Sequence, residues 1–114
     1  MKRYPNNNHP YETLFKDGDN KVVFCNECKI FHVFYGTTSL DLSRSAMDSL
    51  DYELLVYLDF FQDSVESTCR CIEVETPYLG IRLLLSVDDI HRFRKMLYSA
   101  TLAYEEGFWK SGCN

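Results

Sequence analysis

A candidate internal duplication constrains the fold of this chain more than any other feature of its sequence. The segment 28–54 is similar to the segment 71–97, and 6 of the 27 aligned positions are identical. The identical pairs are Cys28/Cys71, Tyr35/Tyr78, Leu40/Leu83, Leu42/Leu85, Ser43/Ser86 and Leu54/Leu97. In both segments the pattern indicates a strand, a turn, a second strand that ends in Leu-x-Leu-Ser, and then an amphipathic helix. Internal similarity of this kind predicts two related strand–strand–helix units.

Periodicity supports the same order of elements in both segments. Residues 29–35 and 70–76 alternate between two faces, which is typical of strands. After each Leu-x-Leu-Ser, apolar residues recur at helical spacing. The first stripe comprises Met47, Leu50, Leu54, Tyr57, Leu58 and Phe61, and the second comprises Ile90, Phe93, Leu97, Ala100 and Tyr104. Ser43 and Ser86 are predicted to cap these helices, and Asp89 completes a capping-box pattern with Ser86.

Turn signals divide the rest of the chain. Asp17-Gly18 predicts a hairpin over residues 11–25, and Gly107 predicts the end of the second helix. We therefore expect a single domain over residues 1–114, with a loose arm at 1–10, the hairpin at 11–25, strand–strand–helix units at 28–61 and 69–106, and a tail at 107–114. The simplest way to bury all the apolar faces is an α+β two-layer sandwich, in which one antiparallel sheet carries both helices on one face.

Composition narrows the class of protein and its partners. The 114 residues are 46% hydrophobic and 15% aromatic, which is typical of a folded globular domain. A net charge of −5 argues against a nucleic-acid partner, because phosphates would be repelled. No apolar run approaches the roughly 20 residues that a membrane span needs, and the first residues lack the apolar stretch of a secretory signal. We therefore expect a cytoplasmic protein with reduced thiols and no membrane partner.

Two cysteine pairs are the strongest candidates for a metal site. Two residues separate Cys25 from Cys28 at a predicted turn, and one residue separates Cys69 from Cys71 on a predicted strand. Four thiolates would complete a tetrahedral structural zinc site, and the duplication places Cys28 and Cys71 at equivalent positions. The alternative is that these cysteines are inert packed thiols, since cysteine is a common small buried hydrophobe. The fifth cysteine, Cys113, is expected to be a free, exposed thiol.

His32 and Glu75 occupy equivalent positions in the two segments and are reserve zinc ligands. His32 also supports an alternative function, in which Cys25 or Cys28 is the reactive thiol of a thiol-dependent enzyme or a redox sensor. The sequence places no orienting acid beside His32, and it has no glycine-rich phosphate loop, no Gly-x-Ser-x-Gly and no His-Glu-x-x-His. An enzyme is therefore the less favoured hypothesis.

The outer face of the predicted sheet mixes apolar residues with polar ones. Ile30, Phe34 and Leu84 are predicted to lie on this face, and a face this apolar is expected to be covered. The N-terminal hairpin, the Phe108-Trp109 tail or a second copy of the chain could cover it, and a homodimer through this face is the interaction that we predict. The basic run His91–Lys95 is interpreted as a solvated helix face.

The stretch 25–38, CNECKIFHVFYGTT, resembles a family of short bacterial proteins described only as a domain of unknown function. Its members are similar in having a Cys-x-x-Cys before a strand that ends in aromatic-Gly-Thr, and then a helix. An Ile-x-x-x-Thr-Pro-like strand (here residues 72–77), a Leu-x-x-Ser strand end and a second helix follow. The resemblance covers about residues 11–104 and implies an intracellular bacterial protein with this order of elements. A second cysteine pair is not a regular part of that pattern.

The leading hypothesis is a small intracellular binding or adaptor domain that acts through contacts with an unidentified protein partner. In this hypothesis the cysteines bind a zinc ion that stabilises the fold and takes no part in catalysis. The resemblance implies no activity, so the choice between this hypothesis and the thiol-dependent alternative depends on the cysteine sites.

Overall fold

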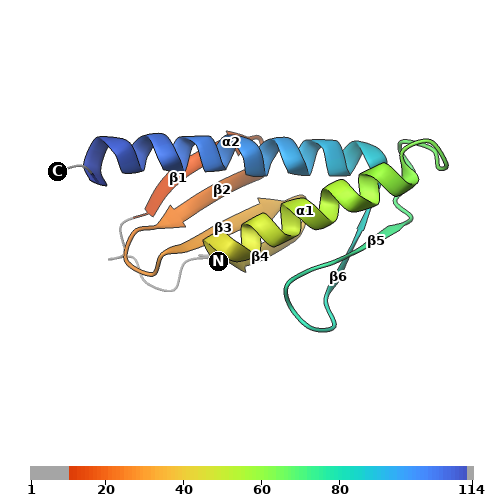
Figure 1. The fold of residues 1–114 in the computed structure, drawn as a ribbon, viewed down its shortest axis with the longest axis horizontal. Helices are drawn as coiled ribbons and strands as arrows, with labels where there is room; N and C mark the ends of the chain where they lie inside the picture. The colour runs from red at the N-terminus through yellow and green to blue at the C-terminus, as the bar shows by residue number, and fades with distance from the viewer. Residues whose placement is uncertain (1–10, 113–114) are drawn as a thin grey trace. The chain divides into compact units, whose positions relative to one another are not determined.

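The computed structural model has an α+β fold and describes residues 11–112, with side chains for residues 11–107 (Figure 1). The chain divides into two compact units. One comprises residues 1–44 and 99–114, and the other comprises residues 45–98. The long helix α2 (Val87–Gly112) contributes to both units. None of the helices in the described part of the chain is long and apolar enough to cross a membrane.

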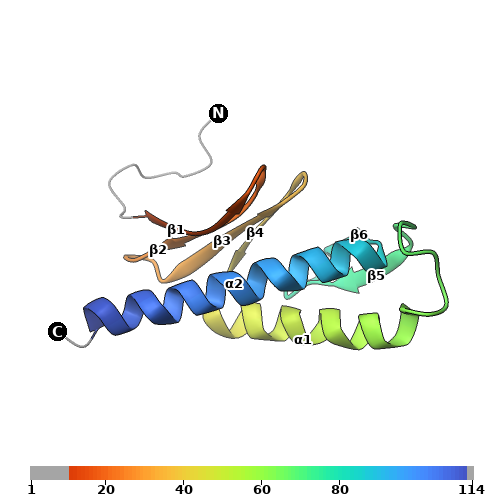
Figure 2. The ribbon, with the colours of Figure 1, turned by 90° about the horizontal axis from the view of Figure 1, so that it is seen from above.

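The first unit is built on a four-stranded antiparallel sheet in the order β1-β2-β3-β4 (Figure 2). Its strands are β1 (Tyr11–Asp17), β2 (Asn20–Cys25), β3 (Ile30–Tyr35) and β4 (Thr38–Leu42). Gly18 and Gly36 supply the positive φ angles, 62° and 57°, that let the chain reverse in the β1–β2 and β3–β4 turns. The hairpin that Asp17-Gly18 predicts is therefore present.

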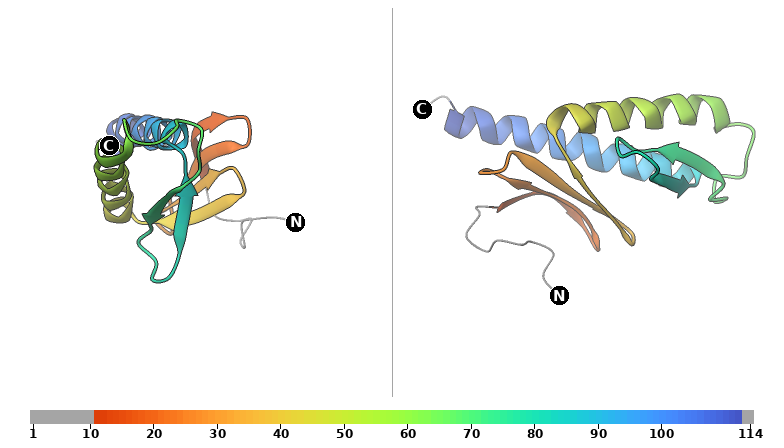
Figure 3. Two further views of the ribbon diagram at one scale, coloured as in Figure 1. Left: turned by 90° about the vertical axis from the view of Figure 1, so that its right-hand side faces the viewer. Right: turned by 90° about the horizontal axis from the view of Figure 1, so that it is seen from below.

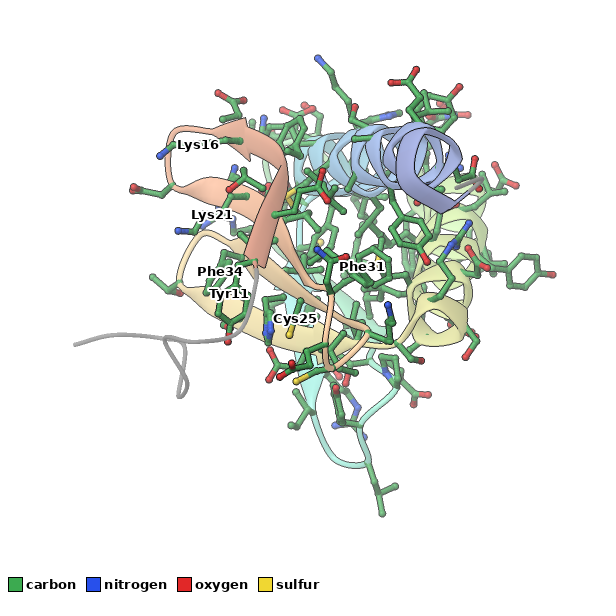
Figure 4. All side chains as sticks on the ribbon, turned by 90° about the vertical axis from the view of Figure 1, so that its left-hand side faces the viewer. Tyr11, Lys16, Lys21, Cys25, Phe31 and Phe34 are labelled. Carbon is green, nitrogen blue, oxygen red and sulfur yellow. The ribbon has the colours of Figure 1, made fainter. Side chains whose placement is uncertain are left out.

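The inner face of this sheet carries the core of the first unit. Alternate residues point to this face and are buried, namely Val22, Phe24, Phe31, Val33, Leu40 and Leu42. Figure 4 shows Phe31 on the opposite side of the sheet from Tyr11 and Phe34. The ring of Tyr104, from the C-terminal part of α2, lies 4.9 Å from the ring of Phe24 and 5.1 Å from that of Phe31. These ring contacts hold that part of α2 against the sheet.

The second unit combines α1 (Arg44–Phe61, from Ser45 onward), a separate hairpin and the first part of α2 (Figure 3). The hairpin consists of β5 (Ile72–Glu75) and β6 (Arg82–Leu85). The buried apolar residues of the second unit come from α1, the hairpin and α2. They include Met47, Leu50, Leu54, Leu58, Ile72, Val74, Leu83, Leu85, Ile90, Phe93, Met96 and Leu97. Arg94 Nε donates to Asp51 Oδ1 at 3.0 Å, which ties α2 to α1.

The start of α2 shows the predicted capping box. The N–H of Asp89 donates to Ser86 Oγ, and the N–H of Ser86 donates to Asp89 Oδ2, each at 3.0 Å. These bonds satisfy two backbone donors at the point where the helix begins. The helix α2 therefore begins where the sequence predicts it.

The prediction of one sheet is wrong, because β5 and β6 form their own two-stranded sheet. Residues 28–54 and 71–97 share the order strand, strand, helix, but the structure does not show a repeat: β3 and β4 belong to the larger sheet. Alternation in a sequence reports which side chains share a face of a strand. It does not report which other strand lies alongside, so the sequence alone could not separate the two sheets.

Two boundaries also differ from prediction. The strand predicted over residues 70–76 is limited to Ile72–Glu75, and α2 continues through Gly107 to Gly112. Glycine inside a helix costs only about 1 kcal/mol of stability relative to alanine, so a helix can continue through a glycine. The predicted arm at 1–10 and Cys113 lie outside the described residues.

Candidate functional site

The first cysteine pair lies in the turn that joins β2 to β3. Cys25 is the last residue of β2, and the N–H of Cys28 donates to Cys25 Sγ at 3.2 Å. The N–H of Lys29 donates to the carbonyl oxygen of Cys25 at 2.8 Å, and Lys29 has a left-handed φ of 60°. The turn thus folds back so that the N–H of Cys28 faces the first sulfur, and this hydrogen bond stabilises negative charge on that sulfur.

The two thiols of this turn differ in exposure. Cys25 is fully buried, whereas Cys28 is exposed. The pKa of Cys28 is raised above its usual 9.0, first by a hydrogen bond with the Cys25 thiol and then by desolvation and by the charges of Cys25 and Glu27. A raised pKa keeps the Cys28 thiol protonated at neutral pH.

The second cysteine pair precedes β5 and does not lie on a strand as predicted. Cys69 and Cys71 are both exposed, and a hydrogen bond with Cys71 is the main cause that raises the pKa of Cys69. Between them, Arg70 donates through Nε to Asp89 Oδ2 at 2.8 Å. This ion pair fixes the backbone that carries both thiols.

Asp89 organises the surroundings of the second pair. Its carboxylate is buried, yet it accepts hydrogen bonds from Arg70, from Arg92 Nη2 at 3.0 Å and from the N–H of Ser86. A buried charge needs such partners, since desolvation without them is costly. The segment 67–70 is tied to the same end of α2, because the N–H of Asp88 donates to the carbonyl oxygen of Ser67.

The predicted zinc ligands are divided between the two compact units. Cys25 and Cys28 belong to the first unit, and Cys69 and Cys71 belong to the second. Among residues 11–112, no group of three or more histidine, cysteine or acidic side chains is placed to hold a metal ion. The four-cysteine site therefore stays a prediction.

His32, a reserve ligand in the prediction, has a carboxylate partner that sequence reasoning missed. It is buried on β3, and its Nδ1 lies 2.8 Å from Asp41 Oδ1, directly opposite on β4. A carboxylate only accepts, so the Nδ1 proton lies on this bond and Nε2 is the basic nitrogen of the neutral ring. The sequence could have predicted this pair, because a two-residue turn at Gly36-Thr37 places Asp41 opposite His32 in the hairpin.

The face of the sheet that carries His32 also carries Cys25. Cys25 pairs with Ile30 across β2 and β3, so it lies diagonally from His32 on the same face. Tyr11 pairs with Cys25 from β1, and its ring meets the His32 ring edge-on with centroids 5.8 Å apart. Figure 4 labels Tyr11 and Cys25 on these neighbouring strands. This face therefore gathers a thiol, an imidazole and a carboxylate.

The predicted dimer residues do not share one sheet face. Ile30 and Phe34 lie on β3 of the four-stranded sheet, and Lys21 Nζ lies 5.1 Å from the centre of the Phe34 ring. Leu84 lies on β6 of the separate hairpin and is 60% exposed. The homodimer itself stays a prediction.

An exposed apolar surface that sequence reasoning also missed lies on α1. Tyr52, Val56 and Phe60 follow each other at intervals of four residues, and their exposures are 65%, 44% and 75%. At this spacing they form one stripe on the side of the helix away from Leu50, Leu54 and Leu58, which we call the apolar stripe. The signal was present in the sequence as a second set of residues at helical spacing.

Glu75, the other reserve ligand, contributes to a cleft. The cleft has a volume of about 200 Å³ and is lined by Ser49, Leu50, Glu53, Glu75, Thr76 and Pro77. It lies between α1 and the start of the loop that joins β5 to β6, so it adjoins the helix that carries the apolar stripe.

Comparisons with known proteins found no matching family model, no matching curated protein and no matching solved structure. The resemblance to the short bacterial proteins therefore stays a hypothesis.

Proposed function

We propose that this chain is a small protein-binding domain and that the apolar stripe of α1 is its contact surface. The exposure of Tyr52, Val56 and Phe60 carries the proposal. Burial of one such side chain contributes about 2 kcal/mol, so water contact at three neighbouring positions is a cost that a partner would remove. Presentation of an apolar helix face with spacing i, i+4, i+8 is a common way in which helices recognise other proteins.

Selection from a displayed library of random peptides tests this function while the natural partner is unidentified. We expect the wild-type chain to enrich peptides whose binding is lost in Tyr52→Asp and Phe60→Asp. Tyr98→Asp is the matched control, because Tyr98 is similarly exposed but lies on α2. Circular dichroism checks that each variant is folded. If no peptide is enriched, or if both α1 variants still bind the enriched peptides, the stripe is not a binding surface.

The proposal includes a structural zinc ion held by the cysteines. The turn at Cys25 and Cys28 supports this part, because a backbone N–H already faces Cys25 Sγ and the second thiol follows within hydrogen-bond reach. A bound Zn²⁺ would favour the thiolate form of both cysteines, so it would lower the pKa of Cys28 that the metal-free turn raises. Cys69 and Cys71 are the predicted source of the remaining two thiolates.

Metal analysis of the purified chain tests the zinc. We expect about one zinc per chain, bound with release of protons and lost in Cys28→Ser and in Cys69→Ser/Cys71→Ser. Cys113→Ser is the control and should retain the metal. Metal-free protein that gains no stability when zinc is added would rule out this part of the proposal. A zinc content unchanged by the Cys69→Ser/Cys71→Ser variant would remove the second pair from the site.

The thiol-dependent enzyme or redox sensor is a second candidate, and the His32–Asp41 pair favours it. A histidine oriented by a carboxylate, on the same face as a cysteine, is the arrangement that activates a nucleophilic thiol. Alkylation at neutral pH, followed by peptide mapping, tests this function. It predicts that Cys25 is labelled in spite of its burial, and that this labelling slows at least about tenfold in His32→Gln. Labelling that is slow in the wild type and unchanged in the variant excludes it.

A further inference from the structure

A carboxylate lies on each side of the apolar stripe. Glu53 precedes Val56 by three residues and Asp59 follows it by three, so the two acids flank Val56 on opposite sides. Within residues 11–112 neither carboxylate forms an ion pair. By contrast, Asp51 on the same helix is already paired with Arg94. The acids beside the stripe are therefore available to a partner.

A cleft lies beside the apolar stripe, on the side of α1 that carries Glu53. The cleft of about 200 Å³ there also contains Glu75, which comes from the end of β5. Two carboxylates from different elements thus line one small cleft, together with the hydroxyl-bearing residues Ser49 and Thr76. Within the described residues Glu75 has no ion pair either. A lysine or arginine head group is the occupant that this lining would stabilise, because both carboxylates lose their mutual repulsion when a cation lies between them.

We propose that the partner is a basic amphipathic helix, an inference that rests on the protein-binding function proposed above. Its apolar residues pack on Tyr52, Val56 and Phe60, which extend over about 12 Å, or two helical turns. Its lysine or arginine residues lie on both sides of that contact, and one of them enters the cleft between Glu53 and Glu75. Nucleic acids and anionic lipid surfaces fit poorly, because they carry the same sign of charge as these acids and as the whole chain.

Two synthetic peptides test the partner class. The first is a helical peptide with leucine at positions i, i+4 and i+7 and lysine on both flanks, and the second has glutamate in place of every lysine. Fluorescence anisotropy measures the affinity of each peptide for the full chain at low and high salt. We expect only the lysine peptide to bind, with affinity that falls as salt rises but persists through the apolar contact.

Paired variants separate this docking mode from general attraction to an acidic protein. Glu53→Gln/Glu75→Gln should weaken the lysine peptide about tenfold, because two charge contacts are lost. Asp17→Asn/Asp19→Asn removes the same charge from the exposed β1–β2 turn and should change the affinity less than about twofold. Phe60→Ser should also weaken binding while circular dichroism shows a folded chain.

Equal weakening by both charge variants, or stronger binding of the glutamate peptide, would overturn the partner class. Co-sedimentation with anionic vesicles that is lost in Phe60→Ser would overturn it too, in favour of a membrane surface. These results differ from failure of the proposed function. A library that enriches neutral or acidic ligands dependent on Phe60 would leave the binding surface intact and reject only the basic helix.

Discussion

At the residue scale, buried polar side chains of this chain are held by partners from other elements. Asp89 is buried against two arginines and a helix N-terminus, and His32 is buried against Asp41. Among the described residues, no buried side-chain nitrogen or oxygen lacks a hydrogen-bond partner. Removing one member of such a set therefore leaves the others buried or unpaired.

Asp89→Ala should destabilise the chain by about 3 kcal/mol, because two arginine contacts and the capping box are lost together. Urea denaturation followed by circular dichroism measures the change. Asp88→Ala is the matched control: Asp88 is also in the first turn, so its loss removes only a favourable interaction with the helix dipole, worth less than about 1 kcal/mol. Equal effects of the two substitutions would show that the carboxylate network does not stabilise the fold.

The exposed thiols should react slowly with alkylating reagents at neutral pH. Hydrogen bonds with Cys25 and Cys71 raise the pKa of Cys28 and Cys69 respectively above 9.0, so the protonated forms are favoured in the folded state. The stabilisation from these bonds is present below the ordinary thiol pKa and is lost as pH rises through the raised pKa. Alkylation rates measured from pH 7 to pH 10 should rise later than those of a model thiol. In Cys71→Ala, the profile of Cys69 should move back toward the model thiol, and an unmoved profile would contradict the hydrogen bond as the cause.

At the element scale, local signals determined where the helices begin and where the tight turns lie. The capping box at Ser86 and the turns at Gly18 and Gly36 satisfy backbone groups through residues within a few positions, so they are visible in the sequence. The end of α2 was missed because Gly107 is tolerated inside the helix. The loop at residues 76–81 also has local support, since Thr76 Oγ1 donates to the carbonyl oxygen of Ile81 at 2.8 Å and accepts from the N–H of Tyr78.

Gly107→Ala should stabilise the chain by about 0.5–1 kcal/mol, because alanine loses less backbone freedom in a helix. A methyl group there would meet Glu12 Oε2 at 3.6 Å, an ordinary van der Waals distance. Thermal denaturation of the variant and the wild type measures the difference. A lower melting temperature would show that residue 107 does not have the helical environment of α2.

At the scale of the whole molecule, the chain consists of two compact units that share α2. Each unit has its own sheet and its own candidate surface. Cys25, His32 and Asp41 lie in the first, and the apolar stripe and the cleft lie in the second. The duplication suggested a single sheet that spans both halves, and the separate hairpin shows why that inference failed: similar local patterns can pair within different sheets.

The predicted homodimer is a question at this scale. Sedimentation equilibrium of the wild-type chain should show a dimer if Leu84, which is 60% exposed, is covered by a second copy. Leu84→Asp should then shift the equilibrium to the monomer, while Asp19→Asn should leave it unchanged. A wild-type chain that is monomeric at the highest concentration would contradict the prediction.

The sequence by itself determined the order of the elements, their apolar faces and the capping box of α2, because those features depend on residues within about one or two turns of each other. The sequence was also sufficient to pair His32 with Asp41, because the two-residue turn between β3 and β4 sets their register. Only the tertiary structure decided that β5 and β6 pair apart from the other strands, and that the duplicated cysteines Cys28 and Cys71 belong to different units. Strand pairing depends on contacts between residues far apart in the chain, and local periodicity does not encode them.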